Sequence, residues 1–180
     1  MTTGCDGLSD SIPIGSIPWD SSWPELVADD DRHAIFFFLQ DRFGIPEKLF
    51  DDYLLLKREG SWWLFRKSPF INSAIGLKVV RVGLRSFSNI GRFIKPTTRF
   101  IQIFGQRATR ARFEIDEKGF RRALSGEAIP LQMALENGYV ILVFQGQPMG
   151  LGLLLNGMLH PQIPRKELAS RKNPPALFQT

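Results

Sequence analysis

Residues 138–165 read GYVILVFQGQPMGLGLLLNGMLHPQIPR and carry the clearest fold signal in the chain. The apolar runs at 139–144 and 149–155 predict two strands. Glycines inside the second run permit the tight curvature and close backbone approach that a small closed barrel requires. Asn156-Gly157 then predicts a two-residue hairpin, because both turn positions favour residues that accept positive φ. This segment is therefore expected to form the closing strands of a small β-barrel.

Upstream of this segment, short runs of β-branched and aromatic residues are separated by glycines, prolines and asparagines from Ser61 onward. This pattern is typical of a small β-rich domain. The further strands that we expect span residues 62–66, 78–84, 99–104 and 109–115. In the last of these, side chains alternate between a polar face with Arg110, Arg112 and Glu114 and an apolar face with Ala111, Phe113 and Ile115.

Helices are expected at three places. Asp116 and Glu117 can cap a short helix that runs through Leu124, and Gly126 is placed to end it. Residues 33–43 have the length and composition of a buried helix, with acidic residues near its positive N-terminal end. Residues 46–56 repeat apolar side chains at helical spacing after a proline, which predicts a second helix.

The order of these elements predicts an α+β protein in which a helical or mixed N-terminal region precedes a small β-barrel with one short helix. Glycines and prolines without periodicity predict an irregular leader over residues 1–28. We expect the mixed unit to span residues 29–95, the barrel to span 96–167, and residues 168–180 to form a tail. The net charge changes sign near residue 60. The boundary between the two units therefore lies either there or later, near Pro96.

Charge divides the chain into two unlike parts. Residues 1–60 hold 5 basic and 12 acidic side chains, net −7, whereas residues 61–180 hold 18 basic and 6 acidic side chains, net +12. A domain with that much positive charge repels itself, and a polyanion lying against it recovers the electrostatic free energy. This asymmetry favours a nucleic-acid partner. The alternative is that the cations are scattered around a barrel and only keep it soluble.

The composition also argues against several classes of protein. Cys5 is the only cysteine, so an internal disulfide framework is excluded, and no secretory leader opens the sequence. The apolar runs fall well short of the roughly 20 residues that a spanning helix requires. We therefore expect a cytoplasmic protein without a membrane role.

No catalytic or metal site stands out in the sequence. His33 and His160 are isolated, and together with Cys5 they do not have the spacing of a metal-ligand set. The acidic run at 29–31 could bind a divalent cation loosely, but such a run ahead of a helix more often complements the helix dipole. No Ser-His-Asp arrangement or phosphate-cradling glycine loop is found. We expect no enzymatic activity, no cofactor and no metal.

Residues 138–165 resemble the closing strands of PUA domains, an RNA-binding fold named after pseudouridine synthase and archaeosine transglycosylase. They look most like the C-terminal module of the RNA cytosine-5 methyltransferases, which ends in a similar glutamine-isoleucine-proline-basic run. The stretches RFGIP (42–46) and KPTT (95–98) also look like that module, so the resemblance covers about residues 33–167. The overall plan is similar to small ribosome-biogenesis factors that join an α/β pre-PUA domain to a PUA domain. The resemblance thus implies a pre-PUA region followed by a PUA-like pseudobarrel.

This resemblance implies a non-catalytic RNA-binding protein that acts in rRNA or tRNA modification or in ribosome biogenesis. The methyltransferases also need a nucleotide-fold domain for S-adenosylmethionine and a catalytic cysteine beside a proline, and this chain has neither. In the ribosome-biogenesis factors the second domain binds RNA and the first tends to contact protein. The acidic N-terminal half would then contact a methyltransferase or a ribosome-assembly protein.

The resemblance also indicates a surface, because PUA domains generally hold RNA between their short helix and the adjoining barrel strands. Matched by their order along the chain, the candidates lie on the strand at 109–115, on the short helix and after the last hairpin. They are Arg110, Arg112, Arg121, Arg122, Gln162, Arg165 and Lys166. Lys95 and Arg99 are second choices. For each arginine the alternative is an ordinary solvated side chain.

A protein–protein adaptor that recruits an RNA-modifying enzyme is the competing hypothesis. On this hypothesis Trp19, Trp23 and the aromatic run at 35–38 anchor a partner, and the positive charge only steers association. Aromatic residues in such runs more often belong to the core.

Overall fold

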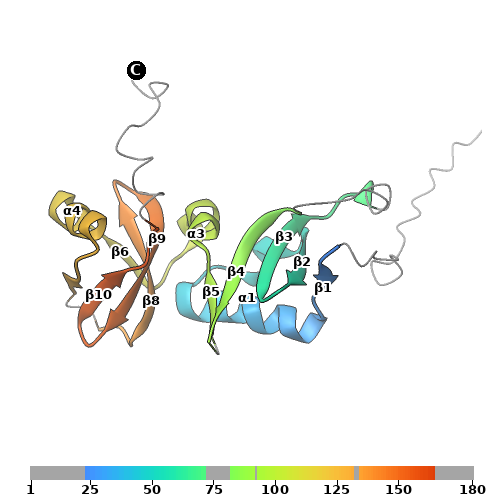
Figure 1. Ribbon diagram of the computed structural model, residues 1–180, viewed down its shortest axis with the longest axis horizontal. Helices are drawn as coiled ribbons and strands as arrows, with labels where there is room; N and C mark the ends of the chain where they lie inside the picture. The colour runs from blue at the N-terminus through green and yellow to red at the C-terminus, as the bar shows by residue number, and fades with distance from the viewer. Residues whose placement is uncertain (1–22, 72–81, 92, 132–133, 165–180) are drawn as a thin grey trace, which may run out of the picture.

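The computed structural model describes residues 23–71, 82–91, 93–131 and 134–164 of the 180-residue chain. These residues form two five-stranded sheets with helices around and between them (Figure 1). The protein is therefore α+β, as its sequence predicts. No helix within the four described segments is long and apolar enough to cross a membrane.

The first sheet is antiparallel and its strands follow chain order. They are β1 (Glu25–Leu26), β2 (Tyr53–Arg58), β3 (Ser61–Arg66), β4 (Leu84–Ile90) and β5 (Phe93–Pro96). Apolar side chains of β2 bury on both faces, because Leu55 joins the main core while Leu54 and Leu56 join a smaller cluster with Trp23. Strand β5 forms one edge of this sheet.

The second sheet has the order β6-β8-β9-β10-β7 and curls into a half-barrel (Figure 1). Its strands are β6 (Arg112–Glu114), β7 (Ile129–Pro130), β8 (Gly138–Phe144), β9 (Gln147–Leu155) and β10 (Met158–Pro161). Strand β6 pairs with β8 in parallel, and the other pairs are antiparallel. A second cluster of buried residues, which includes Val140, Leu142 and Leu159, belongs to this sheet.

The helices hold the two sheets in place. They are α1 (Asp29–Phe43), the 3-10 turn η2 (Glu47–Phe50), α3 (Thr98–Phe104), the 3-10 turn η3 (Gly105–Arg107) and α4 (Glu117–Ser125). Helix α1 runs along the first sheet, α3 lies between the sheets, and α4 lies on the outer side of the half-barrel (Figure 1). Helix α3 contacts both β4 and β9, so it bridges the two sheets.

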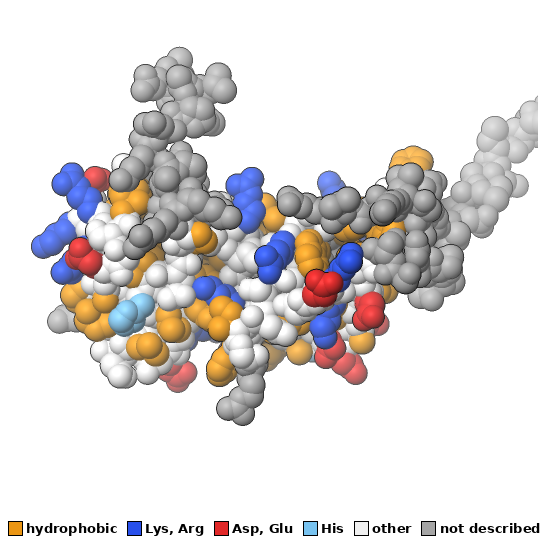
Figure 2. Space-filling model, in the orientation of Figure 1, with side chains coloured by type: hydrophobic (Ala, Val, Ile, Leu, Met, Phe, Trp, Pro, Cys, Tyr) orange, Lys and Arg blue, Asp and Glu red, His pale blue; other side chains and the backbone are white. Residues whose placement is uncertain are grey.

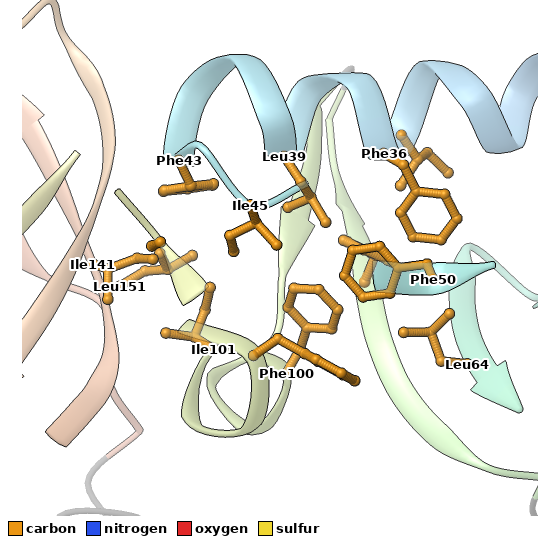
Figure 3. Packing of buried hydrophobic residues seen from close by; sticks show 14 of the residues in the cluster. Phe36, Leu39, Phe43, Ile45, Phe50, Leu64, Phe100, Ile101, Ile141 and Leu151 are labelled. Atoms are coloured by element: carbon orange, nitrogen blue, oxygen red, sulfur yellow. The ribbon is translucent and has the colours of Figure 1, made fainter. Parts of the chain in front are cut away.

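One hydrophobic core extends from the first sheet into the second. Phe36 of α1 stacks on Phe50, with ring centroids 4.5 Å apart. Ile101 of α3 lies beside Ile141 and Leu151 of the second sheet (Figure 3), and all five side chains are buried. Because burial of apolar surface stabilises a fold by roughly 25 cal/mol per Å², this shared core holds the sheets together.

Several predicted elements are confirmed. The strands expected at 62–66, 139–144 and 149–155 correspond to β3, β8 and β9, and the helix expected at 33–43 is α1, which begins earlier, at Asp29. Asn156 and Gly157 have φ values of 49° and 78° in the turn between β9 and β10, as the hairpin prediction requires.

Strand β6 covers the middle of the strand expected at 109–115, and its flanks follow the predicted alternation. Ala111 and Ile115 are buried, while Arg110 and Glu114 are exposed. The predicted short helix is α4, which Gly126 ends in the left-handed conformation with φ 77°. Local signals of turn and cap therefore place these elements correctly.

The helix predicted over residues 46–56 is wrong beyond Phe50. The chain makes only the turn η2 there, and β2 begins at Tyr53. Leu54, Leu55 and Leu56 pair with residues of β3, and their alternation buries them in two different clusters. Pairing and burial on both faces outweigh the helical spacing of the apolar residues.

The strand predicted over residues 99–104 is also wrong, because these residues belong to α3. The Thr97 hydroxyl accepts a hydrogen bond from the Phe100 amide at 3.2 Å, which caps the helix. Phe100, Ile101 and Phe104 then fall on one buried face at helical spacing. The cap, rather than the strand preference of β-branched and aromatic residues, decides the conformation.

Two other predictions agree with the structure only in part. Residues 78–81 of the strand expected at 78–84 lie outside the described residues, and Leu84 begins β4. Within the leader expected to be irregular up to residue 28, β1 pairs with β2, and Trp23 and Val27 are buried. Residues 1–22 lie outside the described part of the chain.

Candidate nucleic-acid interface

Helix α4 is capped at its start and packs against the half-barrel at its middle. The Asp116 carboxylate accepts a hydrogen bond from the Gly119 amide at 2.7 Å and so caps the helix. Phe120 stacks on Phe144 of β8, with ring centroids 4.3 Å apart. The helix therefore presents its outer side chains from a defined position.

Of the predicted arginines of α4, Arg121 is exposed and Arg122 is half-buried, and each has a carboxylate neighbour close in sequence. Arg121 Nε lies 3.4 Å from Glu117 Oε1, and Arg122 Nε lies 3.6 Å from Glu127 Oε2. Figure 2 shows this mixture of blue and red side chains over α4. Exposed pairs of this kind contribute at most about 1 kcal/mol, so a phosphate can displace these carboxylates at little cost.

Lys95 and Gln162 meet at the seam between the two sheets. Lys95 Nζ donates a hydrogen bond to Gln162 Oε1 at 3.2 Å and lies 5.7 Å from the centroid of the Tyr139 ring. Burial lowers the pKa of the Lys95 ammonium below its ordinary value. We call Lys95, Tyr139 and Gln162 the seam cluster. It joins β5 of the first sheet to β8 and to the chain leaving β10 of the second.

Arg99 lies near this cluster along the chain. Thr98, the residue before Arg99, and Ile163, the residue after Gln162, both lie against the backbone of Gly150 in β9. A Cβ on Gly150 would lie 3.2 Å from Thr98 and 2.9 Å from Ile163. The glycine that was expected to permit close approach of the backbone therefore does so at this place. Arg99 itself is exposed and lies 3.4 Å from the Gln102 side-chain oxygen.

Arg110 and Arg112 lie elsewhere, on the segment that leads into β6. The Arg110 amide donates to the carbonyl of Phe43 at the end of α1, at 2.9 Å. Arg112 is half-buried and pairs with Ile141 of β8. The structure thus joins Lys95 to Gln162 directly, places Arg121 and Arg122 on one helix, and leaves Arg110 and Arg112 on a third element. Arg165 and Lys166 lie outside the described residues.

Arg42 is a cation beside the seam cluster that the sequence analysis did not select as a candidate. Its Nε donates to the Tyr139 carbonyl and its Nη2 to the Glu136 carbonyl, each at 2.9 Å. Burial lowers the pKa of this guanidinium, while Glu136 and Asp41 partly oppose that shift. Its place in the RFGIP stretch was a signal, but its partners lie nearly a hundred residues away.

A groove of about 1010 Å³ opens between the sheets beside the seam cluster. Helix α1, strands β2 to β5, and the facing ends of β8 and β9 line it. Its lining includes Arg42, Lys57, Phe93, Tyr139 and Leu155. Tyr139 therefore belongs to both the groove and the seam cluster.

The aromatic anchors that the adaptor hypothesis requires differ in their exposure. Trp23 and Phe36 are buried in hydrophobic clusters, whereas Phe37 is exposed. Trp19 lies outside the described residues. As for metal binding, no group of three or more His, Cys, Asp or Glu side chains among the residues described could hold an ion.

Comparison with known proteins bears on the second half of the chain. Residues 110–166 match the family described as Methyltransferase RsmF PUA domain. This match spans α4 and the whole half-barrel, and it confirms the resemblance to the PUA domain of an RNA cytosine-5 methyltransferase. No curated protein matches the chain. The matched domain is an RNA-binding module and not a catalytic one, so it suggests RNA binding for this part of the chain.

Proposed function

We propose that this chain is a non-catalytic RNA-binding protein that acts in rRNA or tRNA modification or in ribosome biogenesis. The observation that carries this proposal is the matched half-barrel, residues 110–166, which bears Arg121 and Arg122 on α4 and adjoins the seam cluster. Phosphate contacts with these cations would supply most of the affinity, because each one releases condensed counterions.

The described part of the acidic N-terminal half, residues 23–60, forms no ion pair with these cations. In the described segments, no ion pair joins a carboxylate of residues 23–60 to a cation beyond residue 60. The carboxylates near Arg121 and Arg122 belong to α4 itself and to the residues just after it. A polyanion therefore competes only with local, solvent-screened pairs.

A division of labour between the two halves completes the proposal. Residues 96–167 would contact RNA, and the acidic unit at 29–95 would contact a methyltransferase or a ribosome-assembly protein in the cytoplasm. The charge of the two halves supports this division, since the first half is net negative and the second net positive. The candidate RNA contacts remain Arg110, Arg112, Arg121, Arg122, Gln162, Arg165 and Lys166, with Lys95 and Arg99 as second choices.

The test uses two triple variants with the same change of charge. The first is Arg121→Glu, Arg122→Glu and Arg165→Glu, and the matched control is Lys48→Glu, Arg58→Glu and Lys67→Glu, all outside the candidate interface. Fluorescence anisotropy with labelled rRNA or tRNA fragments should show a loss of affinity of at least about tenfold, on the order of 1.4 kcal/mol, that is much larger in the first variant. Circular dichroism checks that both variants fold. Equal losses in the two variants would refute the site.

A further inference from the structure

The groove between the sheets has apolar side chains on its rim that the fold leaves exposed. Ile90 of β4 is 47% exposed, Phe93 of β5 is 72% exposed and Leu155 of β9 is 42% exposed, and all three line the groove. They come from the tip of the β4–β5 hairpin and from the facing end of β9. Exposed apolar groups that gather around one concave surface mark a binding site.

The charges around the groove favour an anionic occupant. Arg42 and Lys57 line it, and Asp31 is the one carboxylate among the described lining residues. Lys57 Nζ lies 5.6 Å from the centroid of the Trp62 ring, and Lys95 has the same kind of contact with Tyr139. A positively charged groove lined with aromatic rings is typical of sites that bind single-stranded nucleic acid.

The groove also has the groups that a nucleobase needs. Phe93 offers an exposed ring for stacking, and the exposed Asn89 amide offers a donor and an acceptor to a base edge. Asn137 is already tied to Asn156 by hydrogen bonds of 2.9 and 3.3 Å. Asn89 is therefore the better placed of the two lining amides to contact a ligand.

We propose that this groove receives unpaired nucleobases of an RNA strand whose backbone crosses the seam cluster. This inference rests on the proposed function and deepens it, because it extends the RNA contact from the half-barrel onto the first sheet. Tyr139 connects the two parts, since its ring lies beneath Lys95 and also lines the groove. An apolar peptide would use the leucines and isoleucines of the groove but would give Lys57 no anionic partner.

The test compares two exposed phenylalanines. Phe93→Ala removes the ring from the groove, and Phe70→Ala removes a ring of similar exposure, 75%, that does not line it. Each protein is titrated with a labelled single-stranded RNA oligonucleotide and with a fully paired duplex of the same sequence. We expect Phe93→Ala to weaken binding of the single strand by about tenfold, the effect of removing one base stack. Phe70→Ala should bind like the unaltered protein.

Four further results decide between explanations. The salt dependence of the binding constant should be unchanged by Phe93→Ala, because a ring releases no counterions, and duplex binding should not change. If Phe93→Ala binds the single strand as tightly as the unaltered protein does, the groove does not hold bases, although RNA binding stands. If the unaltered protein binds neither RNA, both this inference and the proposed function fail.

Discussion

Lys95 Nζ lies 3.2 Å from Gln162 Oε1, although 67 positions separate the two residues in the sequence. The contact ties the last strand of the first sheet to the chain that leaves the half-barrel. Since the two sheets also share one core, cations of the first sheet and of the PUA-like half can serve one ligand. The seam cluster is therefore the place where the two halves of the chain meet as one surface.

The buried position of Lys95 predicts a pH dependence of RNA binding. In the free protein, burial lowers the pKa of this ammonium below its ordinary value of 10.5. A bound phosphate favours the charged form and raises that pKa, so binding takes up a proton and affinity falls as pH rises through the lowered pKa. Titrations from about pH 7 up to the ordinary pKa of 10.5 should show this decline begin below 10.5, and Lys95→Arg should flatten it because arginine stays charged. An unchanged profile in Lys95→Arg would exclude Lys95 as a phosphate ligand.

Neutralising the α4 arginines should change the salt dependence of binding. Each phosphate of a single strand that the protein no longer neutralises lowers the slope of log K against log salt concentration by about 0.7. Arg121→Gln with Arg122→Gln should therefore reduce that slope by up to about 1.4, measured by anisotropy at a series of salt concentrations. Lys48→Gln with Arg58→Gln is the control and should leave the slope as it is. A slope that does not respond to the α4 pair would place the phosphate-binding cations elsewhere.

The cap of α4 makes a defined contribution to stability. Asp116→Ala removes the acceptor of the Gly119 amide and should lower the free energy of unfolding by about 1 kcal/mol. Asp116→Asn keeps an acceptor oxygen and should cost much less. Urea denaturation of the two variants compares these values. Equal destabilisation by alanine and asparagine would show that the negative charge, and not the cap hydrogen bond, stabilises the helix.

Gly44 should tolerate substitution less well than Gly126, although both end helices in the left-handed conformation. Their φ values are 66° and 77°, so alanine at either position costs about 1 kcal/mol for the backbone. At Gly44 a Cβ would also clash with the Thr109 hydroxyl, whereas nothing lies within 4 Å at Gly126. Gly44→Ala should therefore be the more destabilising by at least about 1 kcal/mol in urea denaturation. Similar midpoints for the two variants would contradict the close contact between Gly44 and Thr109.

The elements that were predicted correctly are those with local signals. The Asn156-Gly157 hairpin depends on two residues that accept positive φ, and α4 depends on Asp116 at its start and Gly126 at its end. Such signals act within a few residues, so they set the local conformation without contacts from distant parts of the sequence. They were enough to predict the core of the half-barrel.

The errors arose where partners distant in sequence decide the conformation. Leu54 and Leu55 follow helical spacing with their neighbours, but pairing with β3 makes them a strand. Residues 99–104 form a short run of β-branched and aromatic residues like a strand, but the Thr97 cap and burial of one face between two sheets make them α3. The groove could not be predicted for the same reason, since α1, β5 and β9 meet there only in the folded chain.

Ultraviolet crosslinking of the full chain to RNA, with the crosslinked peptides identified by mass spectrometry, tests the RNA-binding claim most directly. Bases in contact with protein form covalent bonds at the interface, so the crosslinked peptides locate it. We predict crosslinks in α4, in β5 through residue 99, and in the segment from Met158 onward. Crosslinks confined to the acidic residues 23–60, or none above the level of an unrelated control protein, would contradict the account.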